Sequence, residues 1–157
     1  MIQLKRILFP TDFSDLSEIA LRYAVQFARD YEAELHVVHV VDEAYQYWMS
    51  MAPSSVPVGA PIVEDVVKSA RKNLDRLVQE KIGAGLTVTP AVLIGRPFME
   101  IVKYAQAQSI DLIVIGTHGR GGLSHVFMGS VAEKVVRKAP CPVLSVHHPE
   151  HDFVPVP

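Results

Sequence analysis

Hydrophobic residues in this chain follow two patterns that alternate along the sequence. The first pattern is a short run of residues that are all or nearly all apolar, which is typical of a strand buried on both faces. Such runs occupy residues 7–9, 35–41, 112–115 and 142–146. A fifth strand is predicted over residues 86–94, where apolar positions alternate. Pro90 lies within it and lacks a backbone N–H, so this strand is expected at an edge of the sheet.

The second pattern is a step of three or four residues between apolar positions, as on one face of a helix. Four stretches follow it, at residues 16–31, 63–78, 97–105 and 131–136. In the first stretch the stripe comprises Leu16, Ala20, Tyr23, Ala24, Phe27, Ala28 and Tyr31. Ser14 or Asp15 can cap this helix, and Gly83 and Gly85 end the second one. Pro97 lies at the start of the third, where helices tolerate proline.

Strands that alternate with helices predict an α/β fold with a mostly parallel sheet and helices on both faces. The 157 residues contain no internal repeat or linker, so we expect a single open-sheet domain over residues 1–147. A polar, proline-containing tail is expected at 148–157. Residues 43–61 break every period and carry aromatic and methionine side chains. That segment fits a lid over a ligand, a partner surface or a hydrophobic cluster under a long loop.

Composition narrows the classes of protein. Hydrophobic residues make up 49% and charged residues 20% of the chain, and the net charge is −2. This balance argues against a disordered chain and against a general binder of nucleic acid or of anionic membranes. The single cysteine, Cys141, cannot form an internal disulfide, and we interpret it as a small core residue. The apolar runs are too short for a signal peptide or a membrane span, so a soluble, cytoplasmic protein is expected.

Two of the predicted strands end in residues suited to binding a ligand. Residues 10–12 (Pro-Thr-Asp) follow the first strand, and a glycine-rich segment, 116–122, follows the fourth and leads to Gly129 and Ser130. Ligands of open parallel sheets bind beyond the carboxyl ends of the strands. The backbone amides of a glycine-rich loop and of a helix start bind anions. The sequence therefore predicts a phosphate-binding site at this edge of the sheet.

The spacing Gly116-x-x-Gly119, then nine residues, then Gly129-Ser130 resembles the nucleotide-binding motif of the universal stress protein family, in its ATP-binding branch. Further segments resemble other parts of the same family, and together they cover nearly the whole chain outside 43–61 and the tail. They are residues 7–14, 39–42, 95–97, 129–135 and 141–146. The resemblance implies a sheet in the order 3-2-1-4-5, as in adenine nucleotide alpha hydrolase-like folds.

The resemblance also implies which residues would bind ATP with Mg²⁺ on its phosphates. Val40 would hold the adenine ring through its backbone, and Asp12 would lie near the ribose or the metal. The implied nucleotide-binding set is Pro10, Thr11, Asp12, Val40, Ile115, Gly116, Thr117, His118, Gly119, Arg120, Gly121, Gly129, Ser130 and Val131. The last strand, residues 143–146, would pair with its counterpart in a homodimer.

Simpler interpretations of some of these residues stay open. Asp12 can serve only as a turn or capping residue, and Ser130 can be a helix N-cap. His125 and Arg120 can be solvated loop residues, and the spacing of His118 and His125 fits no common metal site.

Three functions follow from the sequence, and the first is favoured. They are an ATP-binding regulator of the stress response, a slow ATP hydrolase, and a dimeric interaction module that binds no nucleotide. A P-loop enzyme is disfavoured because the chain lacks a Gly-Lys-Ser/Thr motif. A dinucleotide-binding oxidoreductase is disfavoured because no glycine follows the first strand.

Overall fold

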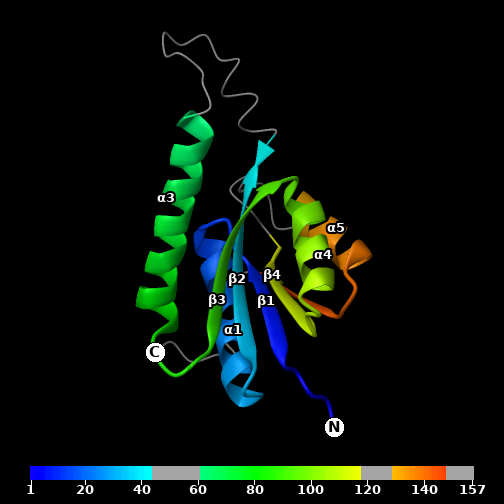
Figure 1. Ribbon diagram of the computed structural model, residues 1–157. Coiled ribbons are helices and arrows are strands. Elements are labelled where there is room, and N and C mark those ends of the chain that lie inside the picture. Colours follow the sequence, from blue (N-terminus) through cyan, green and yellow to red (C-terminus); the bar gives the residue numbers. More distant parts are fainter. Residues whose placement is uncertain (44–60, 118–128, 148–157) are drawn as a thin grey trace.

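The computed structural model describes residues 1–43, 61–117 and 129–147 (Figure 1). Its elements alternate between strand and helix as the hydrophobic pattern predicts. They are β1 (Arg6–Pro10), α1 (Asp15–Asp30), β2 (Glu34–Asp42), α3 (Pro61–Leu77) with a π-helical turn (Val78–Ile82), β3 (Val88–Gly95), α4 (Pro97–Ala107), β4 (Leu112–Gly116), α5 (Ser130–Lys138) and β5 (Val143–Val146). Within these ranges, no helix is both long and apolar enough to cross a lipid bilayer.

The five strands form one parallel sheet in the order β3-β2-β1-β4-β5, which confirms the predicted fold class and strand order. Helices α1 and α3 cover one face of the sheet, and α4 and α5 cover the other (Figure 1). The order of the strands reverses between β1 and β4, because β1 leads to α1 on one face while β4 precedes α5 on the other. The two segments predicted to lack regular structure, the long loop at 43–61 and the tail at 148–157, lie almost wholly outside the described residues.

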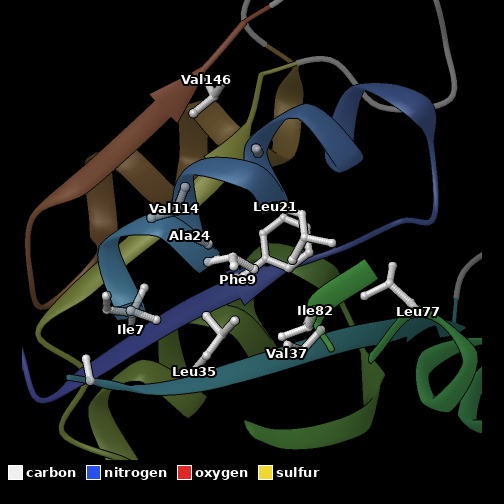
Figure 2. Close-up of a cluster of buried hydrophobic side chains, with 14 of the residues drawn as sticks. Ile7, Phe9, Leu21, Ala24, Leu35, Val37, Leu77, Ile82, Val114 and Val146 are labelled. Carbon is white, nitrogen blue, oxygen red and sulfur yellow. The ribbon is translucent and has the colours of Figure 1, made fainter. Parts of the chain in front are cut away.

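The two faces of the sheet bury separate sets of side chains. Ile7 and Phe9 of β1 point to the α1 side, where they meet Leu35 and Val37 of β2 (Figure 2). Leu8 points to the opposite face and joins the cluster under α4 and α5. All three β1 side chains are fully buried. A central parallel strand covered on both sides cannot carry polar side chains, which explains the continuous apolar runs in the sequence.

Strand β3 lies at the edge of the sheet, as Pro90 predicts. Leu35 N donates to Thr87 O at 2.9 Å, so the backbone groups of Thr87 point to β2. Successive residues of a strand alternate in direction, so Thr89 also faces β2 while Pro90 faces away from the sheet. The missing N–H of Pro90 therefore costs no hydrogen bond within the sheet.

Helix α1 begins as predicted but packs slightly differently from the prediction. Ser14 is its N-cap, and its side-chain oxygen accepts from Ser17 N at 3.2 Å. The predicted stripe was wrong at its end, because Tyr31 lies beyond the helix and is 40% exposed. The residues that α1 buries are Ser17, Ala20, Leu21, Ala24, Val25 and Ala28. Small side chains at four of these positions let the helix approach the sheet closely, and the larger Tyr23 and Phe27 lie at the margin of the contact.

One histidine of the sheet is buried among polar partners. His36 is only 3% exposed, and its Nδ1 is hydrogen-bonded to the hydroxyl of Tyr104 of α4 at 2.9 Å. Its Nε2 lies 3.5 Å from Glu34 Oε1 without forming a hydrogen bond. Burial lowers the pKa of His36 from its usual value of 6.5; Arg6 acts in the same direction, and the Glu34 carboxylate opposes it.

We expect the free energy of unfolding to fall as the pH drops below 6.5. The unfolded chain takes up a proton on His36 there, whereas the buried imidazole does not until a lower pH. The slope due to one such group reaches at most about 1.4 kcal/mol per pH unit. Urea unfolding at several pH values would measure it.

His36→Asn, which cannot titrate, should lower stability but flatten this dependence on pH. A His36→Asn variant with the wild-type slope would contradict this assignment.

Candidate functional site

A pocket of about 210 Å³ opens at the carboxyl ends of β1, β2 and β4, where the order of the strands reverses. The N-terminal ends of α4 and α5 close its other side, through Pro97, Ile101 and Ser130. Open parallel sheets bind ligands at this kind of crevice. The pocket therefore lies where the two unusual strand ends predicted a site.

The structure brings together the predicted site residues that it describes. Ten of them line this one pocket, and they are Pro10, Thr11, Asp12, Val40, Ile115, Gly116, Thr117, Gly129, Ser130 and Val131. The other four predicted residues, His118, Gly119, Arg120 and Gly121, lie outside the described residues, as does His125. Nucleotide binding by these ten residues stays a prediction.

The turn between β1 and α1 is held by hydrogen bonds among its own side chains and backbone groups, which lie only a few residues apart in the sequence. Asp12 Oδ1 accepts from Ser14 N at 3.0 Å and from Ser14 Oγ at 2.5 Å. Thr11 Oγ1 accepts from Phe13 N at 3.0 Å and lies 3.0 Å from Ser17 Oγ. Asp12 thus does act as a turn residue. Since only one oxygen of its carboxylate is used in this turn, the role does not exclude contact with a ligand.

Strand β2 extends past the end of β1 and leaves backbone groups facing the pocket. Val38 O accepts from Thr11 N at 2.8 Å, so the backbone of Val38 faces β1. Val40, two residues later, faces the same way. Strand β1 ends at Pro10, which is in register with Val38, so no strand residue lies opposite Val40 on that side. The Val40 N–H and C=O are therefore a neighbouring donor and acceptor at the pocket wall.

Packing against α1 favours glycine at position 116. A Cβ atom there would lie 3.3 Å from the Leu16 carbonyl oxygen and 3.6 Å from the Ser17 Cα. The absence of a side chain lets the end of β4 lie close to the first turn of α1. The structure thus gives this glycine a steric role beside the ligand-binding role that the sequence predicts, which stays a prediction.

Helix α5 directs its first turn at the pocket. Its N-cap is Gly129, whose N–H donates to Thr117 O, and Ser130 is the first helical residue. The interpretation of Ser130 as the N-cap was therefore wrong. The first intrahelical bond runs from Glu133 N to Gly129 O at 3.0 Å, so the amides of Ser130, Val131 and Ala132 have no partner within the helix. These amides and the helix dipole favour an anion here.

Six lining residues were missed in the analysis of the sequence. They are Ser17, Val38, His39, Pro97, Ile101 and Ala132. Pro97 and Ile101 are four residues apart on α4, so the helical spacing would have placed them on one face once the face was known. His39 is different, because it follows Val38 on the opposite face of β2 and reaches the turn only through its side chain. Its Nδ1 is 2.8 Å from Thr11 O.

The charged groups of the site are few in the part of the chain that the structure describes. Among the lining residues described, Asp12 is the only carboxylate, His39 is the only other titratable side chain, and there is no lysine or arginine. No group of three potential metal ligands occurs within 1–43, 61–117 and 129–147. Cys141 is half-buried against the α4–α5 cluster, and burial raises the pKa of its thiol, which agrees with a packing role.

Comparison with known proteins agrees with this architecture. A family model described as the universal stress protein family matches residues 3–147. Universal stress protein MJ0531 of Methanocaldococcus jannaschii is 34% identical over 148 residues, which is 94% of this chain and 85% of that protein. MJ0577 of the same organism is 30% identical over 155 residues, covering 92% of this chain and 96% of MJ0577.

Solved structures show the same likeness. The structure of MJ0577 superposes with a TM-score of 0.80 at 30% identity, over 96% of this chain and 100% of that one. A universal stress protein from Archaeoglobus fulgidus, solved in complex with dAMP, has a TM-score of 0.62 at 26% identity, over 92% and 98% of the two chains. The family model spans nearly all of the predicted domain, and the fold matches that of the solved relatives. The chain belongs to the universal stress protein family.

Proposed function

We propose that this protein binds ATP in the pocket between β1, β2 and β4 and acts as a nucleotide-dependent regulator of a stress response. The observation that carries the proposal is that one pocket contains two sets of backbone groups that lack backbone partners among the described residues. The Val40 N–H and C=O lie on one wall, and the free amides of the first turn of α5 lie on another. The first pair suits a base, and the second suits phosphates.

The base end of the pocket fits adenine. An adenine edge presents a donor, the exocyclic amine, beside a ring-nitrogen acceptor. The Val40 backbone presents the complementary acceptor and donor. Apolar side chains of Pro10, Val38, Ile101 and Ile115 line the same pocket and would contact the faces of the ring. The dAMP that the Archaeoglobus fulgidus relative holds is also an adenine nucleotide, which supports this assignment.

The phosphate end fits the start of α5. Ser130 is exposed there and adds a hydroxyl to the free amides of the first turn. Glycine at 129 leaves room for a phosphate to approach the backbone. The second carboxylate oxygen of Asp12 would be the protein's contribution to Mg²⁺ carried on the phosphates.

A binding role is favoured over hydrolysis by the state of Asp12. Fast hydrolysis needs a group that orients or activates water. Among the lining residues described, Asp12 is the only carboxylate, and its Oδ1 is already engaged by Ser14. This leaves one oxygen of one carboxylate for such a step, so we propose that the protein retains ATP rather than turning it over rapidly.

Gly129→Val should weaken ATP binding by about tenfold or more, because the added side chain occupies the space that a phosphate needs. The backbone at Gly129 has φ −55° and ψ 146°, which valine adopts without strain, so the fold should survive. Calorimetric titration with ATP and Mg²⁺ would measure the affinity. Val136→Ala is a matched control on the exposed side of α5. Wild-type affinity in Gly129→Val would refute the placement of the phosphates.

Ser130→Ala should distinguish the contribution of the phosphate end of the site from that of the base end. One hydrogen bond from the hydroxyl to a phosphate contributes about 0.5–1.5 kcal/mol, so ATP affinity should fall by about two- to tenfold. Adenosine, which has no phosphate, should bind as tightly as it does to the wild type. Equal losses for ATP and adenosine would instead place Ser130 at the base end.

We further propose that the protein is a homodimer formed through the outer edge of β5. Pro142 O accepts from Ile113 N, and Val146 O accepts from Thr117 N. The backbone groups of Pro142 and Val146 therefore face β4. The intervening residues Val143 and Ser145 direct their backbone groups away from the sheet. An exposed strand edge of this kind pairs readily with a second copy.

Ser145→Pro should dissociate the dimer without disturbing β4, because the amide that it removes points outward. Light scattering should show a mass of twice 17.4 kDa for the wild type and a single chain mass for Ser145→Pro. Ser145→Val, which keeps the amide, should remain dimeric. A dimer that persists in Ser145→Pro would rule out pairing through this edge.

A further inference from the structure

The carbonyl of Thr11 breaks the regular pattern of the β1–β2 ladder. Thr11 N donates to Val38 O at 2.8 Å, which extends the ladder one residue past β1. In a ladder that continued regularly, Thr11 O would next accept from the Val40 amide. Hydrogen bonds among the described residues include none between these two atoms. Instead, Thr11 O lies 2.8 Å from Nδ1 of His39.

The chemistry of this contact defines the donor. A carbonyl oxygen can only accept, so Nδ1 of His39 carries the hydrogen. The imidazole is also held by packing, because its ring lies 4.4 Å from the ring of Phe13. Phe13 has a left-handed backbone with φ 62°, and its N–H donates to Thr11 Oγ1 at 3.0 Å. His39 and Phe13 thus hold Thr11 by its carbonyl and by its hydroxyl.

We propose that His39 is a positioning residue that keeps the last rung of the β1–β2 ladder open. By taking the Thr11 carbonyl, it leaves the Val40 N–H available to a ligand. The neighbouring Val40 C=O is left open by the turn itself, because Phe13 N, which would continue the ladder, donates to Thr11 Oγ1. The inference rests on the proposed function, in which these groups bind the base. Thr11 is 6% exposed, so a carbonyl deprived of His39 would need another donor. The Val40 amide is the donor that the register places opposite it.

Two variants separate the hydrogen bond from the ring contact. His39→Phe keeps an aromatic ring against Phe13 but has no donor. His39→Asn loses the ring but keeps an N–H at the δ position, where His39 Nδ1 now lies. If the hydrogen bond from His39 Nδ1 to Thr11 O keeps the rung open, His39→Phe should bind nucleotide more weakly than the wild type, and His39→Asn should bind it as the wild type does. His39→Leu, which also lacks a donor, takes the place of His39→Phe if the latter fails to fold.

The first measurement is hydrogen exchange of the Val40 amide, followed by NMR in nucleotide-free protein. Closure of the rung in His39→Phe should slow this exchange by about tenfold relative to wild type, while His39→Asn should resemble wild type. A purely structural role for His39 would have the opposite effect, because loosening of the turn speeds exchange. Unchanged or faster exchange in His39→Phe would overturn the proposal.

The second measurement is the affinity for ATP and for adenosine. Both should weaken by about tenfold in His39→Phe, because the loss is at the base end, and His39→Asn should restore them. Wild-type affinity in His39→Phe would also overturn the inference. Failure of the wild type to bind either ligand would refute the proposed function, whereas the exchange of Val40 would still decide whether His39 keeps the rung open.

Discussion

The site depends on the reversal of strand order between β1 and β4. These two parallel strands pair at the centre of the sheet, and both are buried between helices. The chain leaves β1 towards helix α1 on one face of the sheet, and helix α5, which follows β4, lies on the other face, so the described elements diverge at the carboxyl end of this pair. The crevice that remains is the pocket. The lining residues described lie at the carboxyl ends of strands and at the first turns of helices that meet at this crevice.

Differences in length between neighbouring elements supply the chemistry of the pocket. Strand β2 continues past Pro10, so Val40 has backbone groups with no strand opposite, and α5 begins at the pocket rim with free amides. In the proposed function, most of the recognition would therefore be backbone chemistry, which depends on register. The side chains that matter most hold this register, as Thr11 and Ser14 do in the turn after β1.

Much of the site could be predicted because it lies at strand ends and helix starts, which the hydrophobic pattern reveals. Pro10 to Asp12 and the residues from Ile115 to Thr117 were located in this way. The resemblance to a known family added the backbone of Val40 and the strand order. Errors arose where a choice between adjacent residues depends on packing. The N-cap of α5 is Gly129 rather than Ser130, and the buried face of α1 is displaced from the predicted stripe towards Leu21 and Val25.

Local sequence determined the α/β class, the extents of the strands and the edge position of β3, because these follow from periodicity and from the missing N–H of Pro90. The tertiary structure alone decided how far β2 outlasts β1, that Gly116 must admit the first turn of α1, and that His39 takes the Thr11 carbonyl. These features join residues that are 28 or about a hundred positions apart. Periodicity reports on neighbours within one element, so it carries no information about contacts of this kind.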